Sequence, residues 1–598
     1  MKPTMEILEQ INTNSSRNKN EIFTRLYRYL LRPDIYYVAY KNLYANDGAA
    51  TKGIDNDTAD GFSEQYVMNI IEKLKAETYN PLPVRRTYIE KKGSEKLRPL
   101  GIPSFTDKLV QEALRMILEA VYEPIFLDTS HGFRPNRSCH TALKSIKKGF
   151  NGVRWFVEGD IKGCFDNIDH STLIAVINTK IKDAKLIKLI YKFLKAGYME
   201  NWKYHNTYSG TPQGGIISPI FANIYLHELD KFIEQIKSNF DKAPQMVFTS
   251  EYNSLAWRRK VIKDKINEVT EDERVALINE YKELGKQLRK TPSKSQTDKK
   301  LKYIRYADDF IIGINGSKED CELIKKQLSD FIKNTLKMEL SDEKTLITHS
   351  NNYARFLSYD IRVRRDGKVK RDKNGIKKRS LNNSTELAIP LKDKIEKFLF
   401  THNVIRIKND EIIPCERVEL FRLTDLEILS TYNSELRGLC NYYGLASNFA
   451  RLTYFSYLME YSCLKTLAGK HRTKIAKIKK KYKDGKGKWC IPYETQKGTK
   501  RMYFADFQKS KDTAFGDDVI KNVSLYHSHT TTTFESRLKA CKCELCGTTE
   551  SDKYEVHHIN KVKNLKGKER WEQVMIAKRR KTIVVCENCH KIIHGKKV

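Results

Sequence analysis

Two adjacent aspartates, Asp308 and Asp309, have the residue types and spacing best suited to chemistry in this chain. The segments on either side are apolar and rich in β-forming residues, which predicts two strands joined at the acids as a hairpin. Residues 155–160 predict another strand that ends at a third acid, Asp160. Carboxylates on rigid strands can hold the paired Mg²⁺ ions that phosphoryl transfer requires. A solvated Asp-Asp turn is the plainer alternative, because aspartate favours turns.

The last part of the chain carries a second set of candidate ligands, two Cys-x-x-Cys pairs formed by Cys543, Cys546, Cys586 and Cys589. In a chain without an export signal, such pairs indicate a metal site in preference to disulfides. Four thiolates at this spacing predict a structural Zn²⁺ site. Cys541 is left over and is not needed as a ligand.

Four histidines lie between and after these cysteines, as His557-His558 and His590-x-x-x-His594. Two histidines four positions apart on a helix share a face and can hold one divalent ion. A His-His pair on a strand can offer a metal ligand and, beside it, a general base that activates water. The alternative is a small zinc-binding module in which these histidines are incidental.

Composition narrows the possible partners. The chain has 598 residues, with 109 Lys and Arg against 74 Asp and Glu, a formal net charge of +35. Such an excess of positive charge makes nucleic acid the expected partner. The amino terminus lacks the apolar core of a secretory signal, and no run of apolar residues is long enough to span a membrane. We therefore expect no membrane partner and a reducing, cytoplasmic location.

The elements that must position these residues change in character along the chain, whose length predicts several domains. Val110, Leu114, Ile117 and Val121 predict a helix with one apolar face. The broader divisions are a mixed helix and strand region at 1–365, a charged helical insertion within it at about 235–300, a helical region at 388–480, a polar region at 490–535 and the Cys/His segment at 536–598.

The residues around the paired acids resemble a known family. Tyr306-Ala-Asp-Asp309 resembles the catalytic signature of reverse transcriptases, and the other blocks occur in that family's order at Arg98–Pro103, His131–Pro135, Asp160–Phe165 and Gly210–Gly215. With the Cys/His segment, the whole chain resembles the group II intron-encoded proteins of the LtrA type. The resemblance implies an α+β multidomain fold: a right-hand polymerase with fingers and an antiparallel palm sheet, a helical thumb, and a small zinc-braced ββα-metal (HNH) domain.

The resemblance also implies roles in the polymerase. Asp160, Asp308 and Asp309 would bind Mg²⁺. Four further residues would contact the incoming dNTP: Phe165 beside the sugar, Gln213 over the nucleotide, and Lys91 and Arg98 on the triphosphate. By residue type alone, these four are an ordinary core phenylalanine, a turn glutamine and surface cations.

Residues 388–480 resemble the maturase region (domain X), which doubles as the thumb. Cations beside aromatic rings suit phosphate contact and stacking on unpaired bases. The RNA-binding residues expected there are Arg437, Asn441, Tyr442, Tyr443, Lys465 and Lys470. The alternative is that the tyrosines belong to the core of a helical packing module. Residues 490–535 match the DNA-binding region by position.

The terminal segment resembles an HNH endonuclease with a four-cysteine zinc brace. By that pattern His558 is the general base, and His557, His590 and His594 hold a divalent ion, expected to be Mg²⁺. The middle asparagine of the general HNH motif is absent, since its place falls near Lys581-Thr582. Another departure is Ser358, where the family usually has glycine, so we expect weakened primer handling at most.

The favoured hypothesis is a multifunctional ribonucleoprotein enzyme of a bacterial cytoplasm, associated with RNA or the nucleoid. It would bind its intron RNA, promote splicing, nick double-stranded target DNA and copy the intron into DNA from the nicked end; a homodimer is possible. One rival is a splicing factor whose catalytic sites are relics. Another is a reverse transcriptase of the retron or diversity-generating lineages, which lack the maturase-like and nuclease-like regions.

Overall fold

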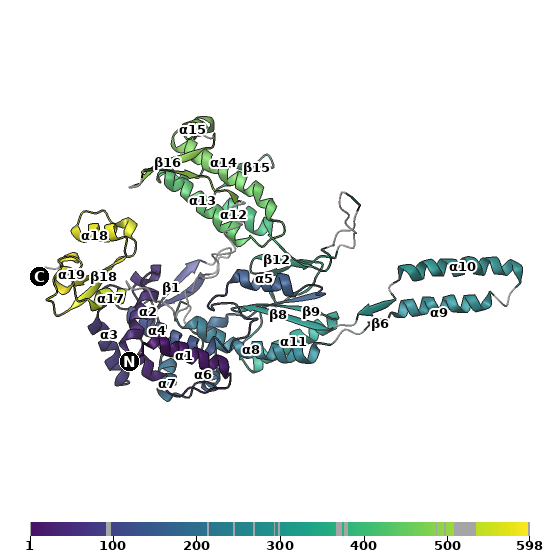
Figure 1. The fold of residues 1–598 in the computed structure, drawn as a ribbon, viewed down its shortest axis with the longest axis horizontal. Helices are drawn as coiled ribbons and strands as arrows, with labels where there is room; N and C mark the ends of the chain where they lie inside the picture. The colour runs from purple at the N-terminus through teal and green to yellow at the C-terminus, as the bar shows by residue number, and fades with distance from the viewer. Residues whose placement is uncertain are drawn as a thin grey trace.

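The computed structural model describes residues 2–595, apart from 91–96, 202, 212–213, 243–245, 267–269, 292, 297–298, 366–373, 376–380, 486, 496–497 and 508–533. Figure 1 shows a central sheet with helices around it, a helical lobe above, a two-helix arm to one side and the carboxy-terminal domain on the other. Lys91 and Gln213 lie outside the described residues.

The amino-terminal part forms the fingers. Its helix α4 (Phe105–Tyr122) begins where the Ser104 side chain accepts a hydrogen bond from the Asp107 amide, and it is buried on nearly every face. The helix expected from Val110 to Val121 is therefore present as the centre of this core. The other fingers elements are α1 (Thr4–Arg17), α2 (Pro33–Leu43), α3 (Glu64–Lys75) and a sheet in the order β2 (Leu97–Ile102), β1 (Val84–Glu90), β4 (Tyr198–Glu200) and β5 (Lys203–His205).

The palm is a four-stranded antiparallel sheet in the order β10 (Ile347–His349), β3 (Trp155–Asp160), β9 (Asp309–Asn315) and β8 (Lys300–Tyr306). Alternate side chains of β9 enter two cores: Phe310, Ile312 and Ile314 join the fingers core, whereas Ile311 joins the thumb core. Because both faces are buried, the strand is an unbroken apolar run. The palm helices are α5 (Cys139–Gly149), α6 (His170–Asn178), α7 (Ala184–Leu194), α8 (Ser218–Phe240) and α11 (Lys318–Asn334).

The charged insertion forms an arm. Helices α9 (Ser250–Lys265) and α10 (Glu271–Lys290) pack against each other and project away from the palm (Figure 1), with strands β6 (Met246–Phe248) and β7 (Lys294–Gln296) paired at their base.

The thumb follows a three-stranded sheet, β11 (Ala354–Phe356), β12 (Tyr359–Val363) and β13 (Thr385–Ala388). Its core lies between α13 (Asp425–Tyr442) and α14 (Leu452–Lys470), where the buried Tyr432 hydroxyl shares hydrogen bonds with Ser462 and Thr466. The remaining elements are α12 (Lys397–Thr401), β14 (Ile405–Lys408), β15 (Glu411–Pro414), α15 (Ile475–Lys481), β16 (Cys490–Thr495) and β17 (Gly498–Tyr503). Among the described residues, none of the helices is long and apolar enough to cross a membrane.

The carboxy-terminal domain consists of α17 (Phe534–Lys539), β18 (Tyr554–His558), α18 (Arg570–Lys578), β19 (Thr582–Cys586) and α19 (Glu587–Ile593). It lies against the fingers beside α2 and α3 (Figure 1). The Phe534 ring lies 4.7 Å from the Tyr40 ring and 5.7 Å from the Phe62 ring, centroid to centroid. The apolar residues of the carboxy-terminal domain therefore join the fingers core.

Candidate polymerase and nuclease sites

The three palm acids meet because of strand register. Asp309 pairs with Tyr306 across a two-residue turn, and Asp160 lies opposite Asp309 on the neighbouring strand. Ala307, inside the turn, has the left-handed φ of 56°, so the hairpin expected at the acids is a tight one. The ammonium group of Lys344 lies 2.7 Å from an oxygen of Asp160 and supplies positive charge at the cluster.

Electrostatics show that these acids suit a cation. Burial and the charge of Asp160 raise the pKa of Asp308. Loss of water and repulsion by Asp308 and Asp160 raise the pKa of Asp309 to about 7. The same carboxylates raise the pKa of Lys344. Hard oxygen donors crowded in this way fit divalent ions such as Mg²⁺, which would remove the repulsion.

A buried arginine, not singled out from the sequence, supports the turn. Arg305 is fully buried, and its guanidinium donates to both oxygens of Asp230, at 2.8 and 2.6 Å. It also donates to the Ala307 carbonyl at 2.9 Å and to the Ser130 hydroxyl at 2.9 Å. The sequence feature that could have identified Arg305 is its place in an otherwise apolar strand, because a buried positive charge needs a negatively charged partner.

The His131-Gly132 block lies directly behind the acids. A Cβ atom added to Gly132 would overlap the backbone nitrogen of Ala307, so glycine is required for this close approach. The Gly132 carbonyl accepts a hydrogen bond from Asn223, and the His131 amide donates to the Arg305 carbonyl. The block therefore positions the turn that carries Asp308 and Asp309.

Two of the four expected nucleotide contacts lie in described parts of the chain. Phe165 is half-buried, with its ring 6.1 Å from that of Phe133, and its carbonyl accepts a hydrogen bond from the Thr211 amide. Arg98 is exposed on β2. Gly210 has a φ of 84°, and a Cβ there would lie 2.6 Å from the Asp166 carbonyl oxygen, so glycine allows the backbone at 210–211 to lie against the Phe165 loop.

Ser358 occupies a position that favours glycine for its own backbone. Leu357 and Ser358 form the two-residue turn between β11 and β12, with φ values of 46° and 58°. Positive φ at both positions is the geometry of a type I′ hairpin. The Tyr442 and Tyr443 hydroxyls donate to the carbonyls of Leu357 and Ser358. Serine in place of glycine at position 358 therefore introduces local backbone strain.

The thumb residues expected to bind RNA have different surroundings. Arg437 is exposed, whereas Tyr443 is buried and Asn441 and Tyr442 are half-buried. The Lys465 ammonium donates to the Pro414 carbonyl at 2.7 Å. Lys470 donates to the Leu423 carbonyl and pairs with Asp425, both at 2.7 Å. The tyrosines and lysines thus hold the thumb together and join it to the palm.

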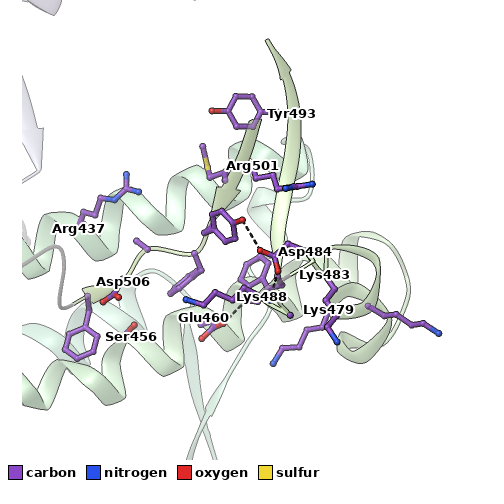
Figure 2. Close-up of a pocket in the computed structure, with 18 residues that line it drawn as sticks. Arg437, Ser456, Glu460, Lys479, Lys483, Asp484, Lys488, Tyr493, Arg501 and Asp506 are labelled. Atoms are coloured by element: carbon purple, nitrogen blue, oxygen red, sulfur yellow. Dashed lines mark hydrogen bonds between the residues drawn. The ribbon is translucent and has the colours of Figure 1, made fainter. Parts of the chain in front are cut away.

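Arg437 instead lines a groove that sequence reasoning did not identify (Figure 2). The groove lies between α13, α14, α15 and the β16–β17 hairpin. Its lining has six cations against three acids, and aromatic side chains lie among them. The cations are Arg437, Lys479, Lys480, Lys483, Lys488 and Arg501.

The four cysteines come together as expected. The Sγ atoms of Cys543, Cys546, Cys586 and Cys589 all lie within 4.8 Å of one another. The Cys546 amide donates to the Cys543 sulfur, which would stabilise a thiolate. This donor set fits a tetrahedral Zn²⁺ ion. Cys541 is exposed and outside the cluster.

The histidines divide into two groups. His557, His590 and His594 form a cluster with Asp60 of the fingers, with all ligand atoms within 4.8 Å of one another. Sequence reasoning missed Asp60, and no local signal marks it. His558 points elsewhere: its Nε2 lies 2.9 Å from the Tyr44 carbonyl oxygen.

The charges in this cluster are strongly coupled. Burial opposes the charge on His590, but hydrogen bonds to Asp60 and Glu555 outweigh it and raise the pKa to about 9. Burial likewise disfavours charge on Asp60, yet the adjacent imidazoles of His557 and His590 hold its pKa well below the usual range. Burial lowers the pKa of His558, which keeps its imidazole neutral as a general base requires.

Comparisons with known proteins match these regions in order. The reverse transcriptase (RNA-dependent DNA polymerase) family model matches residues 89–252, and the type II intron maturase model matches residues 382–537. The AI2M/AI1M-like HNH endonuclease model matches residues 543–590. The maturase match extends beyond the 388–480 region expected from the sequence.

Relatives match the chain over nearly its whole length. The chain is 61% identical over 600 residues to the group II intron-encoded protein LtrA of Lactococcus lactis subsp. cremoris, with all of both chains covered. It is 36% identical to an uncharacterized 91 kDa protein in the cob intron of Schizosaccharomyces pombe, covering 99% of this chain and 73% of that one. A putative COX1/OXI3 intron 2 protein of Saccharomyces cerevisiae is 31% identical, covering 98% and 68%. The chain therefore belongs to the family of group II intron-encoded proteins and is an RNA-directed DNA polymerase and DNA endonuclease with a maturase region, acting in intron splicing and mobility.

Proposed function

We propose that the polymerase uses Asp160, Asp308 and Asp309 to hold two Mg²⁺ ions and extends a DNA 3′ end on the intron RNA with dNTPs. The observation that carries this proposal is the register that sets Asp160 opposite Asp309, with Asp308 in the adjoining turn. The ions would activate the attacking hydroxyl and stabilise the leaving pyrophosphate.

The remaining polymerase residues would bind and select the nucleotide. Arg98 on β2, and Lys91, seven positions earlier in the sequence, would offset the charge of the triphosphate. Phe165, held by the Thr211 amide, would exclude a ribose 2′-hydroxyl from the nucleotide site, and Gln213 would pack over the nucleotide. Arg305 would act as a positioning residue, because it fixes the Ala307 carbonyl inside the turn that carries the acids.

The nuclease would use His558 to take a proton from the attacking water and His557, His590 and His594 to hold a divalent ion beside the scissile phosphate. The ion would stabilise charge on the phosphate and on the leaving oxygen. The four cysteines would hold Zn²⁺ and keep β18 and β19 in place.

The groove lined by Arg437 would bind nucleic acid along its backbone, with intron RNA as the first expected occupant. Its cations suit phosphates, and Trp489, Tyr493 and Phe507 offer faces for unpaired bases. This moves the proposed RNA contact from the tyrosines and lysines at 442–470 toward the exposed α13 and α15 side chains. The nicked double-stranded target DNA would be the second partner.

Reconstitution with the flanking intron RNA tests these assignments. Asp308→Asn should abolish cDNA synthesis and leave splicing and nicking intact. His558→Ala should abolish the nick and the cDNA primed from it, whereas extension of an annealed primer should continue. Loss of splicing in either variant would show that the residue is structural.

A further inference from the structure

Asp60 of the fingers reaches the histidine cluster of the nuclease domain. One carboxylate oxygen lies 3.1 Å from His557 Nδ1 and 3.3 Å from His590 Nε2, and the other lies 2.8 Å from His594 Nε2. Asp60 precedes α3, 497 positions before His557 in the chain (557 − 60). The cluster therefore joins two domains.

The geometry of the cluster is that of a metal site. His590 Nε2 and His594 Nε2 face each other at 3.3 Å, and ligand atoms around a tetrahedral ion with bonds of about 2.1 Å are roughly 3.4 Å apart. His557 is 4% exposed, and its two buried ring nitrogens make no hydrogen bond, the 3.1 Å approach of Nδ1 to the Asp60 carboxylate being an ion-pair contact. A buried imidazole with two unsatisfied nitrogens is costly unless a ligand occupies the site.

A supporting carboxylate orients one of these ligands. Glu555 Oε2 lies 2.5 Å from His590 Nδ1, which leaves Nε2 directed at the cluster. Metal-binding histidines commonly donate their other ring N–H to a carboxylate in this way. Lys553 pairs with the second oxygen of Glu555 and fixes it in turn.

Backbone pairing holds Asp60 in position. The Gly61 amide donates to the Val556 carbonyl, and the Val556 amide donates to the Phe62 carbonyl, so the fingers add a short strand to the edge of β18. The His558 amide donates to Asp60 Oδ1 at 2.7 Å. The carboxylate is therefore fixed by the docking of the two domains.

We propose that Asp60 is the fourth ligand of a divalent, zinc-like ion held jointly by the fingers and the nuclease domain, and that this site closes the nuclease until the domain undocks. The proposal rests on the assignment of His557, His590 and His594 as ligands of the nuclease ion.

Two contacts between the fingers and the nuclease domain block access to the nuclease site in the docked state. A catalytic metal site with three protein ligands keeps a position open for water or substrate, and Asp60 fills that position here. His558 is 8% exposed, with its Nε2 against the Tyr44 carbonyl of the fingers. A DNA phosphate must approach the ion and His558 together. Undocking would free both at once, which couples nicking to engagement of the DNA.

Metal binding tests the ligand assignment without reference to activity. The full-length protein is prepared with Zn²⁺ in its cysteine site and with its weaker metal sites empty, and it is then titrated with Co²⁺. Tetrahedral Co²⁺ complexes absorb visible light far more strongly than octahedral complexes with oxygen ligands. Asp60→Ala and Asp60→Asn should lower the affinity at least about tenfold and change the visible spectrum. Glu64→Ala, an exposed acid on α3, is the matched control and should change neither. Equal affinity and spectrum in the Asp60 variants overturn the assignment.

Amide hydrogen exchange and nicking test closure. Exchange at Gly61 and Val556 should be slow in the metal-loaded protein and at least about tenfold faster in Asp60→Asn or after chelation. In the ribonucleoprotein, Asp60→Asn should nick a labelled target duplex several-fold faster than the unaltered protein. An unchanged or slower rate of nicking would overturn the proposal that the docked state closes the nuclease. The double variant Asp60→Asn, His558→Ala should not nick; nicking by it would overturn the nuclease assignment and leave the Co²⁺ result standing.

Discussion

Arg305 and Asp230 form a bidentate ion pair in which both side chains are fully buried, and the same guanidinium holds the carbonyl of Ala307 beside the palm acids Asp308 and Asp309. The pair thus connects α8 to the turn between β8 and β9. Because the charges have no water around them, removing one partner leaves the other unpaired in the core.

Breaking this pair should destabilise the palm and disable the polymerase. Asp230→Asn and Arg305→Leu should each lower the free energy of unfolding by about 3–5 kcal/mol, since each leaves an uncompensated buried charge or its hydrogen-bonding groups unsatisfied. Chemical denaturation monitored by hydrogen exchange in β8 and β9 would measure this. Primer extension should fall together with stability.

Arg258→Leu is the control for this measurement. Arg258 pairs with Glu280 on the exposed arm, where both side chains are in contact with water. Such pairs contribute at most about 1 kcal/mol, so this variant should behave like the unaltered protein. Equal effects of the buried and exposed substitutions would contradict the role given to Arg305.

Ser358→Gly should stabilise the protein. The φ of 58° at Ser358 costs an L-residue roughly 1 kcal/mol, and glycine removes that cost because it has no Cβ. The gain is partly offset by the greater freedom of glycine in the unfolded chain. Thermal unfolding should show a higher melting temperature for Ser358→Gly and a lower one for Ser358→Val. A lower temperature for the glycine variant would mean that the serine makes a compensating contact.

Sequence reasoning succeeded where local pattern determines structure. The apolar strands around Asp308 and Asp309 and the Cys-x-x-Cys spacing both depend on near neighbours, and the structure contains the expected hairpin and the expected sulfur cluster. It did not find Asp60, because nothing near that residue differs from an ordinary loop. Only docking of a domain about 500 positions later gives Asp60 its contacts.

The thumb tyrosines illustrate another limit of sequence reasoning. An aromatic residue beside a cation has the same composition whether it stacks on a base or packs inside the protein. Tyr443 is 2% exposed and bonds to the turn at Ser358, so its surroundings are set by tertiary packing that the sequence pattern does not contain. Arg437 lies on α13, which ends directly before Tyr443, but it lines the groove.

Glu386 should make stability depend on acid pH. It is buried in β13, and although burial disfavours its charge, hydrogen bonds from Arg364, Ser447 and Arg362 lower its pKa to about 2. A carboxyl group with a lowered pKa contributes stability above its unfolded value, near 4.5, and loses it as pH falls toward 2. Glu386→Gln should therefore cost up to about 3 kcal/mol at neutral pH.

A pH series of denaturation curves measures this effect. The difference between Glu386→Gln and the unaltered protein should shrink as the pH falls from about 4.5 toward 2 and be constant above it. Glu322→Gln, an exposed acid on α11, should show no such trend. A difference that grows on acidification would contradict the assigned pairing.

Removing the Zn²⁺ proposed at the four cysteines should abolish nicking and leave the other activities. Among the residues that the structure describes, the sheet of this domain consists of β18 and β19, and a two-stranded sheet is marginal in water without a staple. Cys586 pairs with Tyr554 in that sheet, so loss of the metal at Cys586 would release the strand that carries His557 and His558. Cys586→Ala or chelation should abolish nicking and raise hydrogen exchange across residues 554–558.

Extension of an annealed primer should survive the loss of zinc, because the palm acids depend on β3, β8 and β9 and on none of the cysteine ligands. Cys541→Ala supplies the matched control, since Cys541 is exposed and outside the sulfur cluster. Retention of nicking in Cys586→Ala would show that the cysteines do not brace the nuclease. Joint loss of nicking and primer extension would instead show that the docked domain supports the fingers, through the contact of Phe534 with Tyr40 and Phe62.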